Sequence, residues 1–330
     1  MKKVFFSLFF LLTALFLISC NYSKKIKIGG RALGTYYRIT YIGEEKAAIQ
    51  CGVDSLLDQI NAQFSIFDPT TLVSRLNHGE NPELSEQFQW LFEKSMEVSA
   101  HTNGAFDITI EPLVEAWGFG KDRKISLDSL VIDSLKQLVG YQRVHIEGKY
   151  LVKENPAIKL NFNAIAKGYA VDQIAEYLFQ MGYPNCLIDV GGEVVARGSN
   201  RGKPWRVGVQ VPTHHADDPI ETNYVFTMQD KAIATSGNYR NYIEQDGKRF
   251  THIVSPFTGG AEVSSLLSVS VIAPDCTTAD AYATAFMVLG IEKSMEIIKH
   301  DTTLAGYFIY DDNGVYKTVK SDRFPDSIQR

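Results

Sequence analysis

The sequence predicts an α+β fold with mainly antiparallel strands and packed helices. Short alternating apolar segments bounded by glycine recur along the chain, and several come in pairs close enough to form hairpins. Amphipathic segments of helical period lie between groups of strands instead of alternating with single strands. No internal repeat and no low-complexity linker divides the chain. Residues 30–330 are therefore expected to form a single domain.

The first 19 residues predict a secretory signal peptide. Two lysines precede an apolar segment from Val4 to Ile18, which is shorter than the roughly 20 residues of a membrane-spanning helix. The segment ends in L-I-S-C at positions 17–20, which resembles a bacterial lipobox and implies cleavage before Cys20 and a lipid on its sulfur. A cleaved signal with an incidental cysteine is the alternative. Residues 20–29 are then expected to form a short tether.

Composition excludes several classes of protein. The 330-residue chain has a formal net charge of −5 and no basic cluster, which argues against a nucleic-acid partner. The four cysteines lack the spacing of a metal site. The glycine patterns of P-loop and Rossmann proteins, the G-x-S-x-G motif and the H-E-x-x-H motif are absent from suitable contexts, which removes the commonest NTPase, hydrolase and zinc-enzyme interpretations.

In the first half of the chain, two strands are expected within residues 25–41, separated by a glycine-rich break. A helix at 44–60 would place Val53, Leu57 and Ile60 on one face. A short helical turn at 74–77 precedes a second amphipathic helix at 84–100, which Asn103-Gly104 would end. A hairpin at 144–152 and a loop that becomes a helix within 161–182 follow.

Strands dominate the second half. Alternation and turn residues predict strands at 186–190, 193–197, 205–211, 223–228, 232–235, 242–244, 250–254 and 267–272, with Gly191-Gly192 as the turn between the first two. The run from 275 to 290 is apolar on nearly every face of a helix, and Gly290 is a plausible end. A helix at 291–300 and a hairpin at 305–319 complete the fold.

Two oxygen-bearing side chains interrupt the apolar helix at 275–290. Asp280 and Thr284 are four residues apart and therefore share one helix face. A buried carboxylate needs a partner, and a hard cation such as Mg²⁺, which prefers oxygen ligands, would supply one. The alternative is that Asp280 caps the helix and Thr284 bonds back to a carbonyl.

Three other stretches carry polar residues at odds with their surroundings. Lys167 lies near the start of the helix in 161–182, where free amides and a cation suit an anion such as phosphate, although a solvated lysine is an equal alternative. The glycine pair after Asp189 brings backbone close to another strand or to a ligand. His252, in a strand before a proline-glycine turn, is a candidate general base or an ordinary structural histidine.

Together the motifs resemble the ApbE family, the FAD:protein FMN transferases. The resemblance runs from about Gly30 to the C-terminal hairpin. The motifs in order are G-T-Y-Y, F-D-P-T-T-L-V-S-R-L-N, N-G-A-F-D, N-A-I-A-K-G-Y-A-V-D, D-V-G-G-E, A-T-S-G-N-Y-R, H-I-V-S-P-F-T-G-G and A-D-A-Y-A-T. The fold that the resemblance implies is a T-fold-like catalytic unit.

The resemblance implies an Mg²⁺-dependent enzyme that splits FAD at its pyrophosphate, joins FMN to a Thr or Ser hydroxyl of an acceptor protein and releases AMP. Acceptors in the family include subunits of sodium-pumping NADH:quinone reductases and Rnf-type complexes. The expected location is the cell envelope, with the lipid on Cys20 holding the enzyme at the periplasmic side of the inner membrane.

Residue by residue, the resemblance assigns the metal to the side chains of Asp280 and Thr284 and the backbone carbonyl of Ala164. His252 matches the proposed catalytic histidine. The flavin-nucleotide contacts that it implies are Leu33, Phe67, Ala105, Phe106, Asp107, Asn161, Lys167 and Ile253.

The sequence departs from the family pattern at three places. Ser255 stands where an aspartate usually follows the histidine, Asn161 stands where an acidic residue is common, and Asn163-Ala164 replaces a glycine pair. Two alternatives follow. Water replaces the acceptor hydroxyl in an FAD pyrophosphatase that yields FMN and AMP, or the protein is a non-catalytic flavin-binding lipoprotein.

Overall fold

The computed structural model describes residues 24–119, 128–211, 221–238, 242–245, 248–261 and 264–328. The predicted signal peptide and Cys20 lie outside these residues. Within the described ranges, no helix combines the length and the apolar character that crossing a membrane requires. The three described cysteines, Cys51, Cys186 and Cys276, are free thiols.

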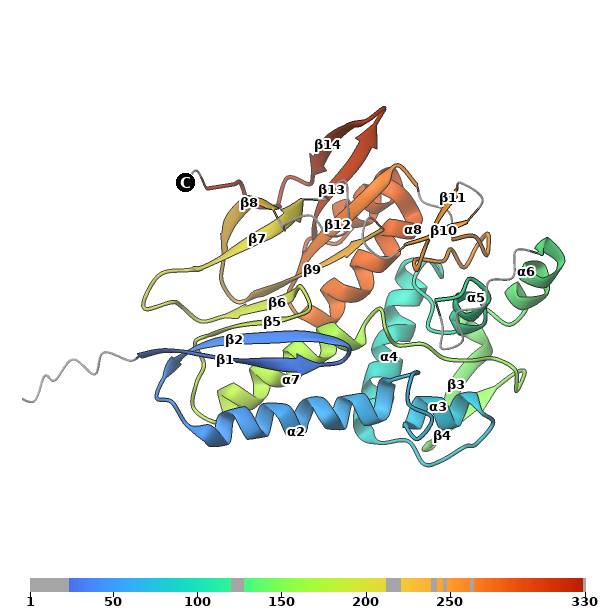
Figure 1. Cartoon of the computed structure of the whole chain (residues 1–330), viewed down its shortest axis with the longest axis horizontal. Helices are drawn as coiled ribbons and strands as arrows, with labels where there is room; N and C mark the ends of the chain where they lie inside the picture. The colour runs from blue at the N-terminus through green and yellow to red at the C-terminus, as the bar shows by residue number, and fades with distance from the viewer. Residues whose placement is uncertain are drawn as a thin grey trace, which may run out of the picture.

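One eight-stranded antiparallel sheet spans the molecule, which confirms the predicted fold class (Figure 1). Neighbouring strands follow the order β1-β2-β5-β6-β9-β12-β13-β14, so strands from both ends of the chain share one sheet. Their bounds are β1 Lys24–Ala32, β2 Thr35–Gly43, β5 Cys186–Val190, β6 Glu193–Arg197, β9 Lys231–Gly237, β12 Leu266–Ala273, β13 Ala305–Asp312 and β14 Val315–Lys320.

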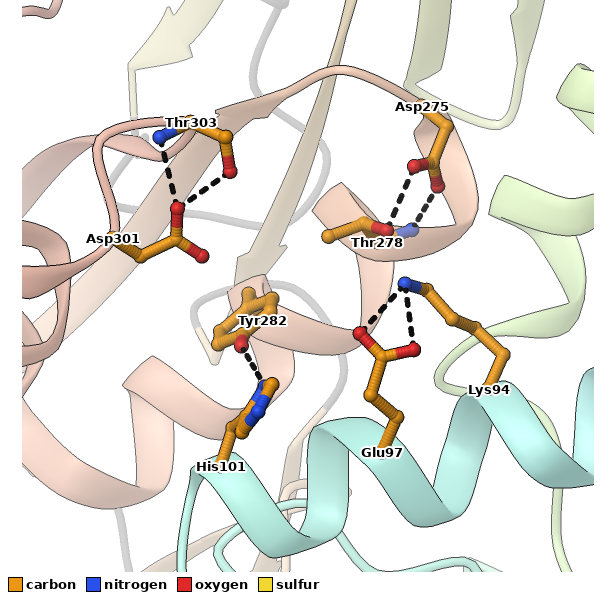
Figure 2. A network of polar contacts seen from close by, with 8 residues as sticks. All are labelled: Lys94, Glu97, His101, Asp275, Thr278, Tyr282, Asp301 and Thr303. Carbon is orange, nitrogen blue, oxygen red and sulfur yellow. Dashed lines mark hydrogen bonds and ion pairs between the residues drawn. The ribbon is translucent and has the colours of Figure 1, made fainter.

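Helices cover one face of this sheet. The helix α7 (Ala166–Gln180) packs on β5 and β6, and α8 (Cys276–His300) packs on β9 and β12 and against α7. Outside this pair lie α2 (Ala47–Phe64) and α4 (Glu86–His101). Figure 2 shows Tyr282 of α8 directed at His101 at the end of α4, with 3.3 Å between the hydroxyl and Nδ1. The main hydrophobic core lies between these helices and the sheet.

The other face of the sheet is covered in part by a hairpin of β7 (Trp205–Val211) and β8 (Glu221–Met228). Trp205 and Phe226 pack there with Ile233, Ile272 and other residues of the sheet in a second hydrophobic cluster. Because the sheet carries apolar side chains on both faces at these strands, it is a central layer between helices and hairpin.

Smaller elements build the side of the molecule beyond α4. They are α3 (Leu72–Asn77), α5 (Glu111–Ala116), α6 (Ser129–Lys136), the 3₁₀ turn η1 (Tyr141–Arg143), the hairpin β3 (Val144–Glu147) with β4 (Tyr150–Lys153), and the hairpin β10 (Tyr242–Gln245) with β11 (Lys248–Thr251). A third apolar cluster joins α5 and α6 to β11 and the segment after it, with Trp117 stacked on Phe250 at 5.0 Å between ring centroids.

Three local features differ from the expectation or sharpen it. The strand predicted from residue 25 is confirmed as β1, which takes in residues 24–29 of the expected tether at 20–29, because Ile26 and Ile28 extend the pairing with β2. The strand around 250 ends at Thr251, so His252 follows β11 instead of lying within it. Gly290 interrupts α8 with φ 77° and ψ 176°, as expected for the end of a first helix.

Candidate active site

A cavity of about 1320 Å³ opens where the turn between β5 and β6 meets the start of α7 and the first half of α8. It exceeds the roughly 300–1000 Å³ of an ordinary small-molecule pocket. With the exception of Leu33, every predicted site residue in the described chain lines it. These are Phe67, Ala105, Phe106, Asp107, Asn161, Ala164, Lys167, His252, Ile253, Asp280 and Thr284.

Leu33 lies elsewhere. It occupies the turn between β1 and β2 with φ 51°, followed by Gly34 with φ 72°, and its side chain packs against the main core. Two consecutive positive φ angles are typical of a tight hairpin turn. The structure therefore gives Leu33 a role in the hairpin, and its contact with a flavin nucleotide stays a prediction.

The start of α8 is fixed by two carboxylates other than Asp280. Asp275 caps the helix and accepts bonds from the Thr278 backbone N–H (2.7 Å) and hydroxyl (2.9 Å), as Figure 2 shows. Asp172 of α7 accepts from the backbone N–H groups of Cys276 (2.9 Å) and Thr277 (2.8 Å). Because these bonds already satisfy the first amides of the helix, Asp280 is not the cap of α8.

Asp280 instead ties α8 to α7. Its side chain is buried, and Oδ2 accepts a hydrogen bond from the backbone N–H of Gly168 at 2.9 Å. Thr284, one turn further along the same face, shares a hydrogen bond of 3.0 Å with the hydroxyl of Ser236 on β9, and no described bond runs from Thr284 to a carbonyl of its own helix. The capping alternative therefore describes neither residue, and both side chains line the cavity.

Lys167 lies between the carboxylates of Glu193 and Asp280. Its Nζ lies 2.8 Å from Oε1 of Glu193 and 3.6 Å from Oδ1 of Asp280. Burial disfavours the charged ammonium, but the carboxylates of Asp280 and Glu193 outweigh that effect and raise the pKa of Lys167. Burial raises the pKa of Glu193, and the charge of Lys167 opposes that shift. The interpretation of Lys167 as a solvated surface residue is therefore wrong.

The oxygen donors at this end of the cavity fit a hard divalent cation. Asp280 and Glu193 are buried carboxylates, Thr284 adds a hydroxyl, and Ala164 lines the cavity two residues before α7 begins. Mg²⁺ prefers oxygen ligands and few protein carboxylates. Within the described ranges, no three His, Cys, Asp or Glu side chains are placed together to hold a metal ion, so a cation here would depend on the two carboxylates, the hydroxyl and a backbone carbonyl.

His252 lines the same cavity. It follows β11 with an exposed side chain, and its ring lies 6.3 Å from that of Phe119 between centroids. The turn after it is closed by Ser255, whose backbone N–H donates to the Gly260 carbonyl at 2.8 Å and whose hydroxyl accepts from the Thr258 N–H at 3.3 Å. The hydroxyl of Ser255 thus makes the turn-closing bond that a carboxylate at this position also makes.

Asp107 shapes the wall of the cavity. One carboxylate oxygen accepts from the Thr109 backbone N–H (2.8 Å) and hydroxyl (2.6 Å), and the other accepts from the Tyr141 N–H (2.8 Å). Burial raises the pKa of Asp107, while these bonds oppose the shift. Both oxygens are occupied within the protein, so Asp107 fixes the segment that carries Phe106.

Asn161 is accompanied by a carboxylate that sequence reasoning missed. Its side-chain amide donates to Glu111 at the start of α5, and its Oδ1 accepts from the Asn163 N–H at 2.8 Å. Burial raises the pKa of Glu111 to about 8, with the bond from Asn161 acting in the opposite direction. An acidic group therefore stands next to position 161 even though that residue is an amide.

Comparison with known proteins agrees with the motifs. The model of the ApbE family matches residues 33–308. A curated FAD:protein FMN transferase of Vibrio cholerae is 33% identical over 313 residues, which cover 92% of each chain. A protein of the same name from Escherichia coli is 33% identical over 336 residues, or 95% of each chain.

Solved structures show the same architecture. The flavin transferase ApbE from Vibrio cholerae superposes with a TM-score of 0.81 at 32% identity, covering 91% of this chain and 98% of that one. The apo form of the flavinyl transferase ApbE from Pseudomonas stutzeri gives a TM-score of 0.81 at 30% identity, with 91% and 95% covered. A family match over most of the chain, with relatives this similar along nearly their whole length, shows that the protein belongs to the ApbE family.

Proposed function

We propose that this protein transfers FMN from FAD to a Thr or Ser hydroxyl of an acceptor protein, in an Mg²⁺-dependent reaction that releases AMP. The observation that carries the proposal is the single cavity that collects Asp280, Thr284, Lys167 and His252. Its relatives bear the name of this reaction. Phosphoryl transfer needs charge neutralisation and alignment more than covalent machinery, and these four side chains supply both.

Different residues of the cavity would bind the metal, the diphosphate and the flavin ring. Asp280, Thr284 and the carbonyl of Ala164 would hold Mg²⁺, which supplies charge neutralisation of the diphosphate when bound. Lys167 adds a positive charge from the start of α7. Phe67, half-exposed at the cavity, and the buried Phe106 provide aromatic surface for the flavin ring.

In the transfer step, the oxygen of the acceptor hydroxyl attacks the phosphorus in the FMN half of FAD, and His252 accepts the proton of that hydroxyl. The new P–O bond joins FMN to the acceptor. The bond between the two phosphates of FAD breaks, and AMP leaves with its phosphate. The exposed position of His252 suits this role, because the acceptor residue has to enter from solvent.

Incubation with FAD, Mg²⁺ and a purified acceptor domain tests the proposal. We expect a covalently fluorescent acceptor band on a denaturing gel and a mass increase equal to one FMN residue, with no labelling when FMN replaces FAD. Release of FMN and AMP without acceptor would instead identify an FAD pyrophosphatase. Tight FAD binding without turnover at any Mg²⁺ concentration would identify a non-catalytic flavin protein.

Two finer proposals concern the acceptor, which the family resemblance implies, and the anchor, which the sequence before Cys20 implies. The acceptor is a redox subunit of a sodium-pumping NADH:quinone reductase or an Rnf-type complex, and a lipid on Cys20 holds the enzyme at the periplasmic face of the inner membrane. Replacing Cys20 by alanine should move the protein from the membrane fraction to the soluble periplasmic fraction. Retention of that variant in the membrane would contradict the anchor.

A further inference from the structure

Glu193 is a buried carboxylate of the cavity to which the proposed function gives no role. It is the first residue of β6, directly after the turn formed by Gly191 and Gly192, and only 3% of it is exposed. Its side chain lines the cavity with Asp280. One carboxylate oxygen contacts Lys167, whereas the other, Oε2, has no hydrogen-bond partner although it is buried. A buried carboxylate oxygen without a partner is costly, so a ligand supplied from the cavity is expected there.

Lys167 occupies the space between the two carboxylates. Its ammonium is within 4 Å of both Glu193 and Asp280, which come from a strand and from a helix more than 80 residues apart. A single cation thus joins groups from β6, α7 and α8. With both carboxylates ionised, this set carries one excess negative charge, which favours binding of a further cation.

Thr284 extends the same donor set. It lies one turn beyond Asp280, and its hydroxyl is held by Ser236 at 3.0 Å. The carboxylates and this hydroxyl are all oxygen donors around one end of the cavity. The ammonium of Lys167 contacts Oε1 of Glu193 and leaves Oε2 without a donor, whereas a divalent cation can take oxygens from several sides.

We infer that Glu193 is a further ligand of the divalent cation, and that Lys167 takes the place of this cation in the metal-free protein. The inference rests on the proposed function, because it concerns the same metal site. Glu193 and Asp280 would hold the ion, and its charge would repel the ammonium of Lys167. The ammonium is then available to the diphosphate of FAD, so metal binding prepares the cationic side of the nucleotide site.

Binding of Mn²⁺ to the full mature chain without FAD tests this inference. Mn²⁺ uses the same oxygen ligands as Mg²⁺, and its free concentration is measured directly by electron paramagnetic resonance. We expect Glu193→Gln, which is nearly isosteric, to weaken Mn²⁺ binding about tenfold or more, and Glu193→Asp to retain part of the affinity. Lys167→Met should bind Mn²⁺ several-fold more tightly than the wild type, because the competing cation is gone.

Glu83→Gln is the matched control, since Glu83 is an exposed carboxylate that pairs with Lys149, and neither residue lines the cavity. Its Mn²⁺ affinity should equal that of the wild type. Thermal unfolding of each variant shows that the fold is retained. Wild-type affinity in Glu193→Gln, alongside lost affinity in Asp280→Ala, would overturn this inference and leave the proposed function intact. Unchanged affinity in Lys167→Met would overturn the displacement of Lys167, and absence of Mn²⁺ binding by the wild type would overturn the metal requirement itself.

Discussion

The backbone N–H of Gly168 donates to the carboxylate of Asp280 at 2.9 Å, so the first turn of α7 is tied directly to the proposed metal ligand on α8. The two helices approach closely at this point. A Cβ at position 168 would overlap the carbonyl oxygen of Cys276 and lie 2.8 Å from Cβ of Asp280. Glycine is therefore required here by space, because no change of rotamer moves a backbone oxygen.

Gly168→Ala should destabilise the protein by roughly 1–3 kcal/mol, since the added methyl group forces α7 and α8 apart. Urea unfolding measures this loss. Gly52→Ala in α2 is the control, because a Cβ there meets only the end of the Tyr177 ring, which can move. Equal stability of the two variants would show that the contact at Gly168 is less tight than described.

Asp280→Asn and Asp280→Ala separate the structural and chemical roles of this carboxylate. The asparagine still accepts the bond from Gly168, whereas the alanine leaves that buried N–H unpaired at a cost of about 1–3 kcal/mol. Both variants should fold and lose Mg²⁺-dependent transfer. Circular dichroism, urea unfolding and the labelling assay test this together, and full activity of Asp280→Ala would remove the proposed metal site.

His252→Ala should retain FAD binding and lose transfer by about 10²–10⁴-fold, which is the usual contribution of a general base. Fluorescence titration of FAD measures the first property, and acceptor labelling measures the second. His145→Ala, an exposed histidine on β3, should behave like the wild type in both. A transfer rate unchanged by loss of His252 would assign the proton to another group.

Glu111 predicts a specific dependence of stability on pH. Burial raises its pKa from 4.5 to about 8, so the folded protein binds a proton that the unfolded chain releases. The free energy of unfolding should therefore fall as pH rises from about 4.5 to about 8, by at most about 1.4 kcal/mol per pH unit from this group. Glu111→Gln cannot ionise, so its stability relative to the wild type should increase across that window.

Urea unfolding at about pH 5 and about pH 8 measures the difference in free energy of unfolding between the wild type and Glu111→Gln. Taking this difference cancels the titration of the groups that the two proteins share. Glu83→Gln, at an exposed carboxylate that pairs with Lys149, is the control and should show no such difference between the two pH values. A constant difference between the wild type and Glu111→Gln at the two pH values would place Glu111 among ordinary ionised carboxylates.

The sequence predicted best the elements whose conformation is determined by neighbouring residues alone. The strands β5 and β6 and the turn of Gly191 between them match residue for residue, because alternation and φ 66° at this glycine leave few other conformations. Gly290 ends a helical segment for a similar reason. By contrast, Gly29 lies inside β1, because pairing with Arg38 across the hairpin outweighs the flexibility of glycine.

The parts of the site that sequence reasoning missed depend on contacts between distant residues. Alternation in β6 does place Glu193 on the buried side with Val195, but only the arrival of Lys167 from α7 shows what the carboxylate meets. The bond between Glu111 and Asn161 joins residues 50 apart in sequence. Local patterns carry no information on such pairs, whereas the motifs could indicate the residues that line the cavity.

The order of strands in the sheet has a consequence for biosynthesis. β2 pairs with β5, and Arg38 of β2 meets Asp189 of β5 across 151 positions of the chain. During synthesis or export with the N-terminus leading, the hairpin of β1 and β2 cannot pair with β5 until more than half of the polypeptide has followed. Pairings between such remote segments form slowly and leave strand edges open in the meantime. The central sheet of this protein should therefore assemble only after residues 186–190 have been synthesised or exported. Before that point the hairpin of β1 and β2 has an unpaired edge, and the chain is then most in need of a chaperone.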